Sequence, residues 1–270
     1  MTSQKESFET FRSLQGPGKF LVLPNGWDAA SARMVQEAGA QAIATSSAAL
    51  AWCHGYADGE TMPRDVVMTA TREVLRVVNL PVTVDSEAGY SADPAKVAEH
   101  VMLLIDLGVA GINLEDGQDA PELVVSKIKA IKAAAKAKGT DIFINARADV
   151  YLANLVPDDA KLAELIRRGK LYAQAGADGF FAPAMTKIED IGKVVREVDL
   201  PVNILLMRAT PPLAQMKEAG VRRISAGALI GRAAYGKAVR AVKILLDEGK
   251  GDAIFETSND CPDFNKWFGA

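Results

Sequence analysis

The chain has 270 residues, of which 49% are hydrophobic and 24% charged, and its 31 Lys and Arg against 34 Asp and Glu give a formal charge of −3. This is the composition of an ordinary globular protein, and the small negative charge excludes a general attraction to nucleic acid or to an anionic membrane. The two cysteines, Cys53 and Cys261, lie far apart and exclude a disulfide scaffold or a cysteine zinc site.

Nothing in the sequence predicts export or membrane insertion. No segment approaches the roughly 20 apolar residues of a membrane span, and residues 1–14 lack the apolar stretch of a secretory signal. We therefore expect a soluble cytoplasmic protein that binds neither nucleic acid nor membrane.

Eight short apolar segments alternate with amphipathic helical patterns along the chain. These predicted strands are residues 20–24, 42–46, 81–85, 111–115, 142–147, 179–183, 201–206 and 223–227. Four of the helical patterns end at a glycine, which supplies the left-handed conformation that terminates a helix. The four glycines are Gly39, Gly108, Gly176 and Gly220. Pro81 and Pro201 open two of the strands and close the helices before them.

Short, almost continuously apolar strands that alternate with helices are typical of parallel strands buried on both faces. Eight such units predict an α/β fold, a (β/α)8 barrel of the TIM type, as a single domain over residues 1–270. The alternative is an open doubly wound sheet. That sheet usually carries a glycine-rich phosphate-binding turn after its first strand, whereas residues 24–28 here read PNGWD.

The C-terminal residues do not belong to a ninth repeat. A helical pattern over residues 232–247 completes the eighth unit, and residues 248–270 form a tail with another short helical stretch. Its aromatic residues Phe264, Trp267 and Phe268 need a surface to pack against, which is either the barrel itself or a partner subunit.

In a TIM-type barrel the carboxyl ends of the strands line the active site. Polar residues gather at these ends: Ser46, Ser47 and Ala48 after the second predicted strand, Asp85 and Glu87 after the third, Glu115 and Asp116 after the fourth, and Arg147 and Asp149 in and after the fifth. The long loop predicted after the second strand also carries His54 and Asp58. His100 falls in the helix after the third strand, where we expect it to face solvent or to be packed.

Carboxylates this close together raise one another's pKa, and a divalent cation relieves the repulsion. Oxygen ligands without Cys or His select a hard ion, so Asp85, Glu87 and Glu115 predict a Mg²⁺ site, with Mn²⁺ as a substitute. The alternative is a rim of salt bridges between these acids, Arg147 and neighbouring lysines.

Two further features suit an anionic ligand, each with a structural alternative. The planar fork of Arg147 matches a carboxylate or an enolate oxygen, although it could also brace the barrel through loop carbonyls. The small residues Ser46, Ser47 and Ala48 allow successive N–H groups to bind a carboxylate, or simply allow close packing. His54 is either an acid–base group or an ordinary polar loop residue.

Five segments together resemble the isocitrate lyase/phosphoenolpyruvate mutase superfamily: residues 24–32, 44–47, 82–90, 111–116 and 145–147. The resemblance extends from about residue 20 to the C-terminus, with all motifs in order. It implies a barrel whose last helix is exchanged between subunits, in a homotetramer or a dimer. It also implies Mg²⁺ bound around Asp85, Glu87 and Glu115, partly through water.

The same resemblance implies a role for each of the other site residues. Ser46, with the N–H groups of Ser47 and Ala48, would bind the carboxylate of a pyruvoyl unit next to Asp85. Arg147 would face the enolate oxygen, and Asp58 would be a polar residue of the catalytic site.

This sequence departs from those relatives after the fourth strand. Members that cleave isocitrate or methylisocitrate carry a K-K-C-G-H loop there, and phosphonomutase-like members a longer basic loop, whereas residues 117–121 here read GQDAP and lead directly into a helix. A shortened cover disfavours reactions that must exclude water.

We therefore expect a Mg²⁺-dependent lyase or decarboxylase that acts on an oxaloacetate-like 2-oxo dicarboxylate through an enolpyruvate intermediate. One alternative is a phosphonopyruvate or carboxyphosphonoenolpyruvate mutase or hydrolase. Another is a catalytically degenerate member that binds a dicarboxylate without turnover.

Overall fold

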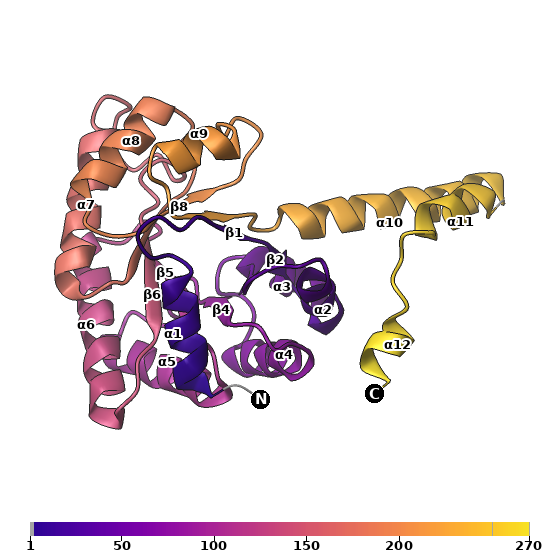
Figure 1. The fold of residues 1–270 in the computed structure, drawn as a ribbon, viewed down its shortest axis with the longest axis horizontal. Coiled ribbons are helices and arrows are strands. Elements are labelled where there is room, and N and C mark those ends of the chain that lie inside the picture. The colour runs from indigo at the N-terminus through magenta and orange to yellow at the C-terminus, as the bar shows by residue number, and fades with distance from the viewer. Residues whose placement is uncertain (1–2, 250, 270) are drawn as a thin grey trace.

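A parallel sheet that curls into a barrel forms the centre of the molecule (Figure 1). The computed structural model describes residues 3–249 and 251–269, and in these residues the sheet has nine strand segments in the order β1-β9-β8-β7-β6-β5-β4-β3-β2. They are β1 Leu21–Leu23, β2 Asn25–Gly26, β3 Ile43–Thr45, β4 Val82–Asp85, β5 Gly111–Glu115, β6 Phe143–Arg147, β7 Gly179–Ala182, β8 Val202–Leu205 and β9 Arg223–Ser225. Each observed strand begins within one residue of its predicted start, with β1 and β2 together taking the place of the first predicted strand.

The barrel closes through an interrupted strand. Only Pro24 separates β1 from β2, and β1 pairs with β9 while β2 pairs with β3. Proline has no N–H to donate to a neighbouring strand, so the first strand is divided there. The sheet is thus nearly closed into a TIM-like barrel, which confirms the predicted fold class and excludes the open doubly wound alternative.

Helices surround the barrel and connect its strands. They are α2 Ala29–Glu37, α3 Ser47–Cys53, α4 Arg64–Val77, α5 Pro94–Leu107, α6 Pro121–Lys138, α7 Lys161–Ala175, α8 Ile188–Glu197 and α9 Leu213–Glu218. The predicted glycine stops are confirmed: Gly108 and Gly176 are the C-caps of α5 and α7, each with φ of 102°. Gly39 and Gly220, with φ of 90° and 91°, follow α2 and α9.

An N-terminal helix, α1 (Gln4–Ser13), covers the amino end of the barrel. Phe8 and Phe11 of this helix are buried against the first strand and Phe143 of β6. The side chain of Gln4 donates hydrogen bonds to the carbonyls of Val109 and Asp141, just before β5 and β6. This end of the barrel is therefore filled, and the opposite, carboxyl end is left for a site.

The segment after β3 was predicted as a long loop, and this is wrong for its first half. Residues 47–53 form α3, capped by Ser46. The reason is local, because a serine cap followed by a run rich in Ala and Leu favours a helix.

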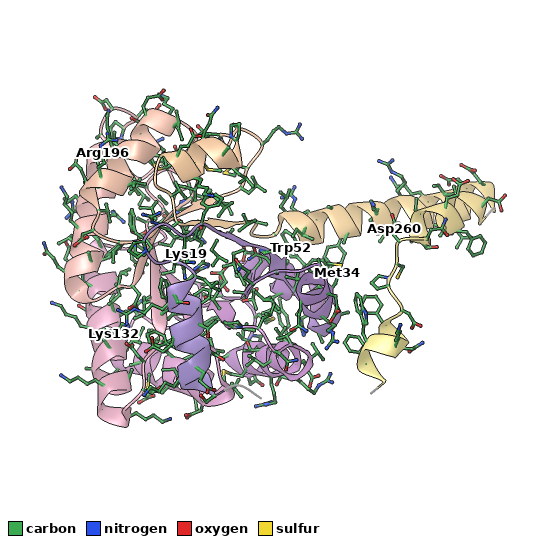
Figure 2. The ribbon with its side chains drawn as sticks, viewed as in Figure 1. Lys19, Met34, Trp52, Lys132, Arg196 and Asp260 are labelled. Atoms are coloured by element: carbon green, nitrogen blue, oxygen red, sulfur yellow. The ribbon has the colours of Figure 1, made fainter. Side chains whose placement is uncertain are left out.

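The C-terminal elements leave the barrel. In Figure 1, α10 (Leu229–Glu248) extends outward with α11 (Asp252–Ser258) beside its far end, and the chain then turns back to α12 (Phe264–Phe268), which lies below α10. Figure 2 shows the side chains at the far end of α10 and along α11 well separated from those of the barrel. Leu246 is 77% exposed and Phe255 70% exposed. Phe264 of α12 lies 5.3 Å from Trp267 and 5.8 Å from Phe268 between ring centroids, and it also lines a cavity with Trp27 and Met34 of the same chain.

No helix within residues 3–249 and 251–269 combines the length and the apolar character that crossing a membrane requires.

Candidate functional site

Asp85 ends β4 and lies at the centre of the candidate site. Its Oδ2 accepts a 3.1 Å hydrogen bond from the N–H of Ser47, and its own N–H donates to Thr45 Oγ1 at 2.9 Å. Asn113, in register with it on β5, lies 3.5 Å away through Nδ2. In the part of the chain that the structure describes, the ion pairs of Lys and Arg include none with Asp85. Its carboxylate is therefore contacted by the hydrogen-bond donors of Ser47 and Asn113 and by no direct ion pair among these residues.

Glu87 lies in a turn just after β4 and is only 6% exposed. Its φ of 48° is in the left-handed region, which directs the side chain toward two donors. These are the N–H of Glu60, 2.6 Å from Oε2, and the hydroxyl of Tyr90, 2.9 Å from Oε1. Burial is the main cause that raises the pKa of Glu87 to about 7, and the charges of Asp85 and Asp58 also raise it. The two hydrogen bonds lower the pKa but do not outweigh these effects.

Arg147 joins two acids at the end of β6. Its Nη1 is 2.6 Å from Glu115 Oε2, and its Nε and Nη2 donate to the carboxylate of Asp149 at 2.6 and 2.9 Å. Burial raises the pKa of Glu115 to about 8 although Arg147 opposes the shift, and the charge of Asp85 adds to it. Burial alone would lower the pKa of Arg147, but the two carboxylates outweigh it and raise that pKa.

The predicted rim of salt bridges is therefore present for Glu115 and absent for two other acids. Arg147 pairs with Glu115, whereas Asp85 and Glu87 have no ion-pair partner among the described residues. Two of the three predicted metal-binding acids therefore lack, in the described part of the chain, the cationic partner that the salt-bridge alternative requires.

Asp116 does not belong to the site, although the sequence places it among the polar residues at the carboxyl ends of the strands. Strand geometry directs it to the opposite side from Glu115. Its carboxylate is buried and accepts from Arg168 at 2.7 Å, from the hydroxyl of Tyr172 at 2.5 Å and from the N–H of Asp149 at 2.8 Å. Asp116 thus supports the backbone that carries Asp149, the acid that orients Arg147.

Replacing Asp116 by asparagine is expected to lower the free energy of unfolding by about 3 kcal/mol, because breaking a buried ion pair leaves an uncompensated charge. Glu164 still pairs with Arg168 at 2.8 Å, which limits the loss. Urea unfolding measures it. The matched control is Asp106→Asn, which breaks an exposed pair with Lys138 and is expected to cost less than about 1 kcal/mol. Equal stability of the two variants would contradict the buried support.

The raised pKa values of Glu87 and Glu115 predict how stability depends on pH without metal. Each folded carboxyl holds its proton to about pH 7 and about pH 8, while the unfolded groups lose it near 4.5. The folded state then binds more protons, so its stability falls as pH rises through this window. His100, whose pKa burial lowers to about 4, acts in the opposite direction below its ordinary value of 6.5.

The test is therefore made above that value, between about pH 6.5 and 8.5, on protein treated with EDTA. We expect the free energy of unfolding to decrease across this range and the slope to be smaller in Glu87→Gln. Stability that stays constant or increases would contradict the raised pKa values.

The predicted carboxylate-binding group lies at the start of α3. Ser46 is buried, and its Oγ accepts a weak 3.4 Å hydrogen bond from the N–H of Ala49. The N–H of Ser47 is already used by Asp85, so the Ser46 hydroxyl proton and the N–H of Ala48 are the donors that remain for a ligand. The role of these three residues stays a prediction.

The other candidates have ordinary surroundings. Asp58 is exposed in the loop after α3 and acts on Glu87 through its charge. His54 caps α3 and lies 2.9 Å from the Leu50 carbonyl through Nδ1. His100 is packed rather than solvent-facing, with its ring 5.5 Å from that of Tyr90.

Sequence reasoning missed three contacts at the site. It did not predict Asp149 as the partner of Arg147, although residues two apart on an extended strand share a face and could have indicated it. The contacts of Glu60 and Tyr90 with Glu87 had no such signal, because they depend on a left-handed turn.

No group of three or more His, Cys, Asp or Glu side chains within residues 3–249 and 251–269 forms a ready-made metal cluster. The donor set nevertheless suits Mg²⁺, because this ion binds proteins through one or two carboxylates and keeps several waters. The unpaired Asp85 and the raised pKa values of Glu87 and Glu115 are the signs of a charge that a cation would balance.

The chain is similar to known proteins of one family. The family described as phosphoenolpyruvate phosphomutase matches residues 11–246. The provisionally assigned 2-methylisocitrate lyase 2 of Corynebacterium glutamicum is 30% identical over 235 residues, which cover 83% of this chain and 71% of that protein. An uncharacterized protein of Mycobacterium tuberculosis is 33% identical over 242 residues, 88% of this chain and 89% of that protein.

Among solved structures, a provisionally assigned phosphonomutase from Burkholderia cenocepacia is 40% identical, with a TM-score of 0.84 over 88% of this chain and 99% of that chain. The protein therefore belongs to the phosphoenolpyruvate mutase/isocitrate lyase superfamily.

Proposed function

We propose that the protein is a Mg²⁺-dependent lyase or decarboxylase of a small, oxaloacetate-like 2-oxo dicarboxylate. The observation that carries this proposal is the position of Arg147, held by Glu115 and Asp149 at the carboxyl end of the barrel beside the unpaired Asp85. An arginine fixed in this way offers a rigid donor to an oxyanion that develops during a reaction.

Asp85, Glu87 and Glu115 are the residues that would hold the ion. When bound, Mg²⁺ would supply positive charge beside the carboxylate and carbonyl oxygens of the substrate. Ser46 and the N–H of Ala48 would orient the substrate carboxylate. Asp58 is proposed as a polar residue at the rim that restrains the substrate.

Arg147 would stabilise the enolate formed when the substrate is cleaved. A guanidinium has five N–H groups, and three are used by Glu115 and Asp149, so two remain. Cleavage of the bond between C3 and C4 releases carbon dioxide from oxaloacetate and leaves its electron pair in the enolate of pyruvate. A proton from solvent then returns to C3.

The short connection between β5 and α6 is consistent with this choice. Residues 116–120 lead directly into the helix, as predicted, and provide no cysteine, histidine or lysine that could serve as an acid over the substrate. A reaction that needs enolate stabilisation and a solvent proton is compatible with such an open site.

A second candidate is P–C bond chemistry on phosphonopyruvate or a related phosphonate. It is favoured by the 40% identity to a provisionally assigned phosphonomutase. The same three acids and Arg147 would serve, because this reaction also passes through an enolate of pyruvate.

A panel of 2-oxo acids and phosphonates, assayed with Mg²⁺, with Mn²⁺ and with EDTA, tests the proposal. We expect pyruvate from oxaloacetate only with metal. Because metal ions decarboxylate oxaloacetate slowly by themselves, the Asp85→Ala protein at the same Mg²⁺ concentration gives the background. Equal rates with EDTA would contradict the proposal, and phosphate released from phosphonopyruvate would favour the second candidate.

We also propose that α10 packs on a second copy of the chain in a dimer or tetramer. The helix leaves its own barrel with Val239, Val242 and Leu246 exposed, while Val22 on the outer face of β1 is 47% exposed. A helix with an exposed apolar side and an uncovered strand of the same chain are complementary surfaces.

Sedimentation velocity tests the assembly. We expect wild-type protein to sediment as a dimer or larger, and Val242→Glu to shift it toward monomer. Leu103→Glu, which changes an apolar residue of similar exposure on α5, is the matched control and should leave the assembly unchanged. A wild-type monomer at every concentration would contradict the proposal.

A further inference from the structure

A charged side chain lies in the interior of the barrel, beneath the candidate site. Arg223 begins β9, and its side chain is completely buried. Its guanidinium carbon is 5.7 Å from the ring centroid of Phe11, in the helix that covers the amino end. Arg223 therefore lies between the filled end of the barrel and the site at the other end.

This guanidinium is poorly satisfied by its neighbours. Nη2 donates a 3.3 Å hydrogen bond to Asn113 Oδ1, while Nε and Nη1 have no hydrogen-bond partner among residues 3–249 and 251–269. A buried charge without a partner costs several kcal/mol. A cation kept at such a cost needs a compensating negative charge nearby.

The hydrogen bond from Arg223 to Asn113 connects Arg223 to Asp85, because Asn113 also contacts Asp85. Asn113 lies on β5, four strand positions from β9 in either direction, so Arg223 reaches across the barrel interior. The amide of Asn113 directs Oδ1 to Arg223 and Nδ2 to Asp85, over 3.3 and 3.5 Å. Asn145 fixes this orientation by donating to the same oxygen at 2.9 Å.

The electrostatics agree with the path of hydrogen bonds. Burial lowers the pKa of Arg223 to about 9, and Asp85 is the acid whose charge opposes this shift. The two charges therefore stabilise each other across the amide of Asn113, which presents its positive end to the carboxylate.

We propose that Arg223 is a positioning residue that acts through Asn113 to hold the Asp85 carboxylate correctly oriented for a divalent cation. This role rests on the proposed function, because Asp85 is a metal ligand only in that proposal. Partners that orient a metal ligand typically change metal affinity about 10–100-fold when they are removed.

Mn²⁺ titration of EDTA-treated protein, followed by the electron paramagnetic resonance signal of free Mn²⁺, measures this affinity without any assay of activity. We expect Arg223→Met to weaken Mn²⁺ binding at least about tenfold, and Arg223→Lys to remain within about threefold of wild type because it restores the charge. Circular dichroism and thermal unfolding show which variants are folded.

The adjacent Arg222 provides the matched control. It lies near the surface, and its side chain donates a 3.4 Å hydrogen bond to the Lys19 carbonyl. Arg222→Met removes the same side chain one residue away and should leave Mn²⁺ affinity unchanged.

A double-mutant cycle with Asn113→Leu distinguishes action through Asn113 from a separate effect. We expect the combined variant to bind Mn²⁺ about as weakly as the weaker single variant, because both changes break one path. Effects that multiply would overturn the path. If Arg223→Met does not fold, the Mn²⁺ affinity of Asn113→Leu is the test. An affinity equal to that of wild type in Asn113→Leu would overturn the proposal.

The two proposals fail in different ways. A folded wild-type protein that does not bind Mn²⁺ would overturn the proposed function together with the role of Arg223. Tight binding by wild type and equally tight binding by Arg223→Met would overturn the positioning role alone.

Discussion

Replacing Asp85 by asparagine is expected to reduce the metal-dependent rate at least about a hundredfold. The substitution keeps the size of the side chain and an oxygen for the N–H of Ser47, but it removes a charge with which no Lys or Arg of the described residues forms an ion pair. Initial rates over a wide range of Mg²⁺ concentration measure the effect. The Mg²⁺ concentration at half-maximal rate should increase greatly, which separates loss of metal affinity from loss of turnover.

The matched control is Asp119→Asn, because Asp119 is an exposed acid in the short connection before α6. It should change neither the rate nor the Mg²⁺ requirement by more than about twofold. A fully active Asp85→Asn protein with an unchanged Mg²⁺ requirement would remove Asp85 from the metal site.

Replacing Arg147 by lysine is expected to lower kcat about a hundredfold, with a smaller change in KM. Lysine keeps one positive charge but cannot contact Glu115 and Asp149 together and still present two donors to the substrate. The interaction lost is one that strengthens as the enolate forms, so its loss appears mainly in kcat. Steady-state kinetics at saturating Mg²⁺ measure both constants.

Arg167→Lys is the control, because Arg167 lies exposed on α7 and pairs with Glu164 away from the barrel mouth. It should behave as wild type. A folded Arg147→Lys protein with kcat close to wild type would show that a rigid guanidinium is not required, and a charge of any geometry would then suffice.

The fold could be predicted largely because the residues that end its helices and precede its strands act locally. Glycine in the left-handed conformation ended helices at Gly108 and Gly176, and proline preceded β4 and β8. The helix after Ser46 was missed because a serine followed by small residues also suits a loop. The outward course of α10 had no signal in the helical pattern of residues 232–247, and only the resemblance to the superfamily implied that this helix leaves its own barrel.

The site could be predicted in part. Asp85, Glu115 and Arg147 could be expected to lie close together because parallel strands end at one edge of the barrel. The register between β4 and β5 could not be predicted. Asp85 pairs with Asn113 and not with Glu115, which lies two residues further along β5. Alternation along the strand could have separated Glu115 from Asp116, which faces the other way.

The role of Arg223 had no sequence signal. Its contact with Asn113 joins residues 110 positions apart on opposite sides of the barrel. Such a contact arises from closure of the sheet, and an arginine at the start of an apolar strand is otherwise typical of an exposed position.

A crystal structure of the protein with Mg²⁺ and oxalate tests the central claim most directly, because oxalate resembles the enolate of pyruvate in shape and charge. We expect an ion about 2.1 Å from a carboxylate oxygen of Asp85, with Glu87 and Glu115 bound directly or through water. An oxalate oxygen should lie within hydrogen-bond distance of Arg147. A pocket without ion or oxalate at saturating concentrations, or Arg147 turned toward solvent, would contradict the account.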